Sequence, residues 1–327
     1  MVSTPFFIIV IAKQGDSAAT NKRLMEQMVT KVNAQEYMQK GIELYDSSDY
    51  QTAIQYFKKA LDASNNAETM LYLGQCYHAM QDFKEAAKWY QQSAEQGNPL
   101  AQFRLGMCYL DGEGVPEDDK EAVKWFDLSA RQGKPIAQRM MGECYYNGYG
   151  VAVDKKEAVR WYKLYVEQRE EKAAVAPIII RLGMMYLEGD GIPKNAEEAV
   201  KWFRVSAEQG FSQAQYCLGC CYFHGNGVSK DKEEAEKWFR KSAEQGLADA
   251  QFMMGICYYT GLPWHGKESA KWFKLAAEQG NADAQLFLGM CYKDGFGVSE
   301  DKEEAEKWLK LSAEQGNQRA IELLNDI

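Results

Sequence analysis

The stretch Ala101-Gln-Phe-Arg-Leu-Gly-Met-Cys-Tyr109 decides the fold, because close copies of it recur along the chain. A glycine stands in the same register at residues 74, 106, 142, 183, 219, 255 and 289, and each is followed three residues later by tyrosine, from Tyr77 to Tyr292. Tryptophan recurs at residues 89, 125, 161, 202, 238, 272 and 308, at intervals of 34 to 41 residues. A period this steady indicates tandem structural repeats.

Each repeat is predicted to contain two helices. In the first, Ala101, Leu105 and Cys108 lie three or four residues apart and form one apolar stripe. The second carries its own stripe, which in the same repeat includes Trp125 and Phe126. We call these two helices helix A and helix B.

Turn and cap signals separate the two helices. A Gly-x-Gly-Val or Gly-x-Gly-Ile loop, in which glycine permits positive φ, begins at residues 112, 148, 189, 225 and 295. Capping boxes then open helix B, in the pairs Asp118/Glu121, Asp154/Glu157, Asn195/Glu198, Asp231/Glu234 and Asp301/Glu304. Helix B ends at a further glycine, as in Ala-Glu-Gln-Gly246.

Two repeats break this pattern. Arg169 replaces the glycine after helix B, and residues 170–176 are predicted to continue that helix until Pro177 ends it, with a kink in the stack. The loop at residues 261–266 is shortened and lacks the capping pair, so Trp264 and His265 are predicted to be exposed. These two residues form a secondary candidate contact loop, with drift in a surface loop as the alternative explanation.

The whole pattern, Ala-x3-Leu-Gly-x2-Tyr followed by Asp-x2-Glu-Ala-x2-Trp-Phe, resembles the Sel-1-like repeat, a relative of the tetratricopeptide repeat. Six units over residues 101–316 match it, with an insertion near 169–177. Residues 34–67 resemble a plain tetratricopeptide unit, and 67–100 are intermediate. The resemblance implies an all-α fold, a right-handed α-α superhelix (solenoid) of Sel-1-like and tetratricopeptide-like helix pairs. Around it we expect a disordered tail at 1–18, an N-terminal helix with two tetratricopeptide-like repeats at 19–100, and a capping segment at 317–327.

Composition limits the possible partners. The net charge is −9 with an isoelectric point near 5.1, and no stripe of Lys and Arg is present, which argues against nucleic-acid binding. The longest apolar run, Phe6 to Ala12, is about a third of the ~20 residues that cross a bilayer, so no membrane span is expected. Neither a particular partner nor an oligomeric state follows from these residues.

Cysteine usage points to a reducing compartment. Six cysteines share one helix-A register, at residues 76, 108, 144, 221, 257 and 291. Equivalent positions on stacked helices lie about 10 Å apart, whereas a disulfide needs Cα atoms within roughly 7 Å. We therefore expect free, structural thiols and a cytoplasmic protein, with export to the periplasm as the alternative, since the run from Phe6 is at the short limit of a signal core. Cys217 and Cys220 lack partners for a zinc set, so no metal or cofactor is expected.

No catalytic arrangement can be assigned, and we expect a protein that is not an enzyme. The three histidines lie in different repeats, and none has Ser or Cys at a suggestive spacing. Some proteins of this family are linked to penicillin binding, and Ser-x-x-Lys does occur at Ser229–Lys232 and Ser299–Lys302. Neither Ser-Asp-Asn nor Lys-Thr-Gly accompanies it. A penicillin-binding or β-lactamase-like hydrolase remains the alternative function.

The resemblance implies that helix A lines the concave face of the superhelix and forms a groove for a peptide. The residues assigned to this groove are Phe103, Met107, Arg139, Glu143, Tyr146, Met184, Leu187, Tyr216, Phe223, Phe252, Ile256 and Tyr259, with Leu110, Leu286 and Met290 beside them. Exposed Met and aromatic side chains form adaptable binding surfaces. Packing between neighbouring helices is the alternative role for the same residues. We expect an adaptor or scaffold that binds a partner protein or peptide; a purely structural spacer would have a more polar groove.

Overall fold

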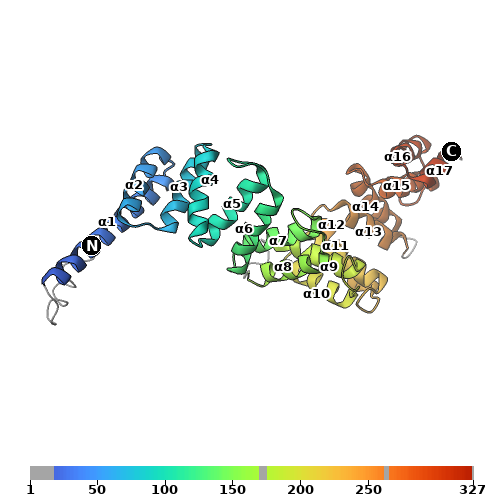
Figure 1. Cartoon of the computed structure of the whole chain (residues 1–327). Helices are drawn as coiled ribbons and strands as arrows, with labels where there is room; N and C mark the ends of the chain where they lie inside the picture. Colours follow the sequence, from blue (N-terminus) through green and yellow to red (C-terminus); the bar gives the residue numbers. More distant parts are fainter. Residues whose placement is uncertain (1–17, 169–174, 261–264, 326–327) are drawn as a thin grey trace, which may run out of the picture. The chain divides into compact units, whose positions relative to one another are not determined.

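The computed structural model describes residues 18–168, 175–260 and 265–325, and all of the regular secondary structure in these ranges is helical (Figure 1). None of the described helices is both long and apolar enough to cross a lipid bilayer. The helices up to residue 167 are α1 (Ala18–Asp46), α2 (Tyr50–Ala63), α3 (Ala67–Ala79), α4 (Phe83–Glu95), α5 (Pro99–Asp111), α6 (Asp119–Arg131), α7 (Pro135–Asn147) and α8 (Lys155–Glu167). Those that follow are α9 (Ala176–Glu188), α10 (Ala196–Ala207), α11 (Ser212–His224), α12 (Lys232–Glu244), α13 (Ala248–Tyr259), α14 (Gly266–Glu278), α15 (Ala282–Asp294), α16 (Lys302–Glu314) and α17 (Gln318–Leu324).

The chain divides into two compact units, residues 1–165 and 166–327. Within each unit the odd-numbered helices are helix A and the even-numbered ones helix B, and successive helices pack against one another (Figure 1). The division falls inside the run of glycine-tyrosine repeats rather than near residue 100, where the repeat type changes. At the end of the second unit, α17 packs on α16 and buries Ala320.

In each helix hairpin a large side chain of helix B lies directly on the helix-A glycine, and in all but one of these contacts it is an aromatic ring. A Cβ placed on Gly106 would lie 2.6 Å from Phe126, and one on Gly219 would lie 2.7 Å from Phe239. Both rings are fully buried. The aromatic residue after tryptophan therefore requires glycine opposite it, which explains why the two recur together. This contact is the hairpin lock, and the residues opposite the other glycines are Phe57, Tyr90, Tyr162, Phe203, Phe273 and Leu309.

The loop after helix A joins one repeat to the preceding one. Gly112 ends α5 with φ of 68°, in the left-handed conformation that glycine adopts without strain. Gly114, with φ of 77°, lies against the preceding helix B so closely that a Cβ would be 2.0 Å from the carbonyl oxygen of Phe83. The same approach recurs at Gly150 over Asp119, at Gly227 over Ala196 and at Gly297 over Gly266.

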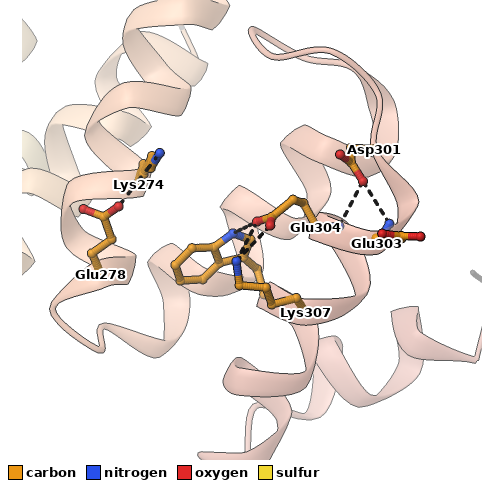
Figure 2. A network of polar contacts seen from close by, with 7 residues as sticks. Lys274, Glu278, Asp301, Glu303, Glu304 and Lys307 are labelled. Atoms are coloured by element: carbon orange, nitrogen blue, oxygen red, sulfur yellow. Dashed lines mark hydrogen bonds and ion pairs between the residues drawn. The ribbon is translucent and has the colours of Figure 1, made fainter.

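The start of helix B agrees with half of the predicted capping box. The side chain of Asp118 accepts hydrogen bonds from the amides of Lys120 and Glu121, and Asp231 and Asp301 act likewise. Asp154 and Asn195 each accept from the amide three residues later. The reciprocal half was wrong, because the Asp118 amide donates instead to the carbonyl oxygen of Tyr109 at 2.9 Å. Figure 2 shows the arrangement at α16, where Glu304 contacts Lys307 and accepts a hydrogen bond from the indole of Trp308 rather than turning back to Asp301. Each cap therefore also ties the end of helix A to the start of helix B.

Two buried polar ladders connect helix B to helix A. In the glutamine ladder, Gln102 donates to the carbonyl of Ala94 at 3.2 Å and accepts from Gln132 at 2.7 Å. In the serine ladder, the Ser129 hydroxyl donates to the carbonyl of Pro99 at 2.6 Å. Both ladders satisfy polar groups that would otherwise be buried without partners.

The two irregular repeats differ from the sequence prediction. Helix α8 ends at Glu167, and Pro177 lies in the first turn of α9, where its missing amide leaves no hydrogen bond unmade. Residues 169–174, Trp264 and residues 1–17 of the tail predicted at 1–18 lie outside the described residues, whereas Ala18 is the first residue of α1. The kink stays a prediction.

Candidate functional site

The candidate groove residues lie on helix A at three before, one after and four after its central glycine; we call this surface the helix-A face. It contributes Phe103, Met107, Arg139, Glu143 and Tyr146 to the first unit and the other seven residues to the second. All of the twelve except Phe103 are half-buried, and none is fully exposed.

In the first unit this face is partly filled by packing between helices. Phe103 is buried, with its ring centroid 5.8 Å from that of Phe126, and Met107 packs on the same cluster. The next repeat is more polar. Glu143 accepts a hydrogen bond from Asn147 at 3.4 Å, and the Lys155 ammonium lies 5.1 Å from the ring centroid of Tyr146.

In the second unit the helix-A face is apolar. Met184 and Leu187 pack on the cluster that contains Phe203 and Trp238. In the next repeat, the rings of Tyr216 and Phe223 lie 6.0 and 6.2 Å from that of Phe239.

Five rings gather over α13, α14 and α15. Phe252 lies 5.9 Å from the buried Phe273 and 5.6 Å from Phe287, and Tyr259 lies 5.5 Å from Phe287 and 5.1 Å from Phe296. We call this set the aromatic cluster; Ile256 packs beside it, and all of its rings except Phe273 are half-buried. Sequence reasoning missed Phe287 and Phe296. The signal for Phe296 was present, since Phe stands between loop glycines where three other loops carry Glu113, Asp190 and Asn226 and a fourth carries Tyr149.

The sequence left two roles open for these residues, peptide binding and packing between neighbouring helices, and both remain open for the same side chains. These side chains contact the protein interior, and most of them keep part of their surface open. Burial raises the pKa of the Tyr216 hydroxyl on this face, which is hydrogen-bonded to Cys220. Peptide binding at the helix-A face stays a prediction.

The secondary contact loop is only partly described. His265 precedes α14 and makes no side-chain cap, as its sequence implied. The expectation that it is exposed was wrong: it is half-buried, with its ring 5.5 Å from that of Tyr258. This edge-to-face contact with a tyrosine near the end of helix A holds the imidazole against the protein.

The cysteines are core residues, as their register predicted. Five of the six in-register thiols are buried and Cys257 is half-buried. Burial raises the pKa of Cys76, Cys144 and Cys291 to about 12, and that of Cys108 to about 11. Such thiols stay protonated at neutral pH and are poor nucleophiles. Within the described ranges, no three His, Cys, Asp or Glu side chains are grouped so that they could hold a metal ion.

The Ser-x-x-Lys pairs lie at the surface. Ser229 is in the loop before α12 and Lys232 is the first residue of that helix, and both are exposed. Ser299 and Lys302 occupy the same positions before α16 and are likewise exposed. Both pairs therefore lie at an exposed helix N-terminus, whereas a serine nucleophile would be enclosed in a site.

The repeats match known families. The Sel1 repeat model matches residues 99–134, 135–168, 179–211, 212–247, 248–281 and 282–317, which is more than half of the chain, and a tetratricopeptide repeat model matches residues 44–104. A sel1-like repeat-containing protein of Acanthamoeba polyphaga mimivirus is 40% identical over 84 residues, which span 24% of this chain and 15% of the viral protein.

Solved structures of Sel1 repeat proteins are similar to this chain. A Sel1 repeat protein from Oxalobacter formigenes is 30% identical with a TM-score of 0.66, and the match covers 98% of this chain and 92% of that one. A protective antigen of uropathogenic Escherichia coli strains, described as displaying an SLR fold, is 32% identical with a TM-score of 0.76 over 93% of this chain and 66% of its own. Repeats of these kinds generally mediate protein–protein interaction and typically form non-catalytic scaffolds. The chain belongs to the Sel1 repeat family, with a tetratricopeptide repeat preceding its Sel1 repeats.

Proposed function

We propose that this protein is a non-catalytic scaffold that binds a peptide segment of a partner protein on the helix-A face of its second unit. The observation that carries the proposal is a series of half-buried rings on the successive A helices α11, α13 and α15, namely Tyr216, Phe223, Phe252, Tyr259 and Phe287. Rings held in place by packing lose little conformational entropy when a ligand covers their open surface, and aromatic side chains are enriched in binding hot spots.

The test uses substitutions that other repeats already contain. Leu71 and Leu286 occupy the register of Tyr216 and Phe252, so the variant Tyr216→Leu/Phe252→Leu keeps the position filled while removing both rings. Peptides are first selected from a random phage-displayed library on the wild-type chain, and their affinities are then measured by fluorescence anisotropy. Losing hot-spot contacts of about 2 kcal/mol or more corresponds to weakening of roughly thirtyfold.

A matched control removes apolar surface from helix B. Leu275 and Leu311 are each 38% exposed, and Leu275→Ala/Leu311→Ala should leave peptide affinity unchanged. Raising the salt concentration should also have little effect, because screening weakens charge pairs rather than apolar contacts. Equal binding by wild type and Tyr216→Leu/Phe252→Leu, with both variants folded, would contradict the proposal.

We also propose that the protein works in a reducing compartment, the cytoplasm. The support is the burial of thiols at equivalent positions on successive helices, which separates them. Thiol titration without reductant in denaturant should find all eight cysteines of the chain free. Three or four intact disulfides in protein from its native source would assign it to an oxidising compartment instead.

A further inference from the structure

The loop between α7 and α8 carries exposed apolar side chains that the corresponding loops lack. Val153 is 58% exposed and Tyr149 is 48% exposed. Where Val153 stands, the loops of other repeats carry Glu117, Lys194, Lys230 and Glu300. A charged residue is therefore the rule at this exposed position, and hairpin packing does not require valine there.

This loop borders an open hollow in the first unit. The hollow has a volume of about 600 Å³ and is lined by Val151 and Ala152 on one side and by residues 117–120 on the other. Gly148 and Gly150 also line it and bring no side chains to fill it. The two sides meet closely at Gly150, where a Cβ would be only 2.2 Å from the carbonyl oxygen of Asp119.

The far side of the hollow is acidic. Glu117, Asp118 and Asp119 line it together with the single cation Lys120. Asp118 caps α6, but none of the four takes part in an ion pair within the described part of the chain. The hollow therefore joins an apolar edge to a lining with three acidic side chains and one basic one, and its complement is a positive charge next to an apolar side chain.

We propose that this hollow is a second docking site, independent of the helix-A face, for a peptide segment of another protein in which Arg or Lys lies next to a large apolar residue. The basic side chain enters the hollow and meets Glu117 and Asp119, and the apolar side chain covers Tyr149 and Val153. Tandem repeats would then engage one partner on the helix-A face and another, or another segment, at this loop.

The probes are fluorescein-labelled octapeptides with one Arg and one Phe, placed one to four residues apart in a Gly/Ser background. Matched sets replace Arg by Glu, or Phe by Ser. Two variants of the full chain remove the two halves of the site. Tyr149→Asn/Val153→Ser removes the apolar edge, and Glu117→Lys/Asp119→Lys reverses the charge with residues that other repeats carry at Lys230 and Lys232.

Anisotropy titrations should find at least one Arg/Phe spacing that binds the wild type, and each variant should weaken binding at least tenfold. The matched Glu and Ser peptides should bind at least tenfold more weakly than the Arg/Phe parent. Glu300→Lys, which changes the corresponding loop before α16, and Tyr216→Leu/Phe252→Leu should both leave affinity unchanged, so failure here is separable from failure at the helix-A face.

Three results would overturn the proposal. The first is that no Arg/Phe peptide binds more tightly than its Glu or Ser counterpart. The second is wild-type affinity in both folded variants. The third is a wild-type dimer in sedimentation experiments that Tyr149→Asn/Val153→Ser converts to monomer, because this would assign the surface to a second copy of the chain.

Discussion

Two regions of the molecule share one packing scheme but differ in their polar ladders. The first region is the repeat at residues 212–247. The second is the pair of repeats on either side of the unit boundary, at residues 135–168 and 179–211. In the first, Gln215 donates to Ala207 at 3.1 Å and accepts from Gln245 at 2.8 Å, and Ser242 donates to Ser212 at 2.8 Å. In the second group, the Gln138 Oε1 atom and the Ser206 hydroxyl are buried without a hydrogen-bond partner in the described structure.

The hairpin lock does not differ between these regions. A Cβ on Gly142, Gly183 or Gly219 would lie 2.3, 2.4 or 2.7 Å from the ring opposite it. Apolar packing therefore holds the helix pair together in all three of these repeats. The glutamine and serine ladders between helix B and helix A, by contrast, are incomplete beside the unit boundary. The two kinds of contact can be separated by substitution.

The largest effect is expected at the apolar core of the complete repeat. Trp238 is 7% exposed, and Trp238→Ala should destabilise the protein by about 3 to 5 kcal/mol, as large aromatic truncations do. Because the stability of stacked repeats is approximately a sum over neighbours, amides in α11 to α13 should open first in hydrogen exchange. Uniform loss of protection across all of the helices would show that the repeats do not unfold locally.

Substituting the glycine of the hairpin lock should lower the free energy of unfolding by the same amount in both regions. Gly183→Ala and Gly219→Ala each place a methyl group against a buried ring that cannot move away, so each should destabilise by roughly 1 to 3 kcal/mol. Urea denaturation of the two variants checks this. Gly289→Ala is the matched control: it meets the flexible Leu309 instead of a ring and should cost less. A clearly smaller cost at Gly183 than at Gly219 would mean that the boundary repeats are loosely packed as well.

Much of this arrangement is predictable from sequence, because periodic signals carry it. The helix pairs, the glycine loops and the N-cap residues follow from spacing alone. The reciprocal half of the capping box does not, because the Asp118 amide finds the carbonyl of Tyr109, a partner at the end of the neighbouring helix A. Pro177 was misread for a related reason: proline both ends helices and begins them, and only the position of α9 decides which.

The candidate site was less predictable than the fold. Helical spacing placed Tyr216, Phe252 and Tyr259 on the helix-A face. How far their rings are covered depends on packing within each helix pair, by Phe239 and Phe273, and on contact with Phe287 of the next repeat. The loop at residues 148–153 shows the opposite case. Val153 departs from a charged register in the sequence, yet its meaning depends on the hollow and on the acidic side chains across it.

Replacing the glutamine of the ladder should destabilise the repeat at residues 212–247 more than the repeat at residues 135–168. Gln215→Met keeps the side-chain shape but removes two hydrogen bonds, the one that Gln215 donates to the carbonyl of Ala207 and the one that it accepts from Gln245. At about 0.5 to 1.5 kcal/mol for each bond, it should destabilise the protein by about 1 to 3 kcal/mol. Gln138→Met loses only one long hydrogen bond, to Ala130 at 3.4 Å, and also removes the unpartnered oxygen. It should therefore cost about 1 kcal/mol or less. Equal costs in urea denaturation would indicate that Gln138 has a partner in solution.

The smallest change in stability is expected at the serine ladder. Ser→Ala removes only the hydroxyl group, so the same substitution can be compared directly between the two regions. The Ser242 hydroxyl donates to the carbonyl of Ser212, and Ser242→Ala should cost about 1 kcal/mol, the usual net contribution of a hydrogen bond. Ser206 is equally buried, but its hydroxyl has no partner, so Ser206→Ala removes a desolvated polar group and should be neutral or slightly stabilising. Differences of this size are best resolved by hydrogen exchange of α10 and α12 in the two variants under identical conditions. A loss of protection in α10 as large as that in α12 would show that Ser206 is hydrogen-bonded in solution, and the contrast between complete and incomplete ladders would then be limited to glutamine.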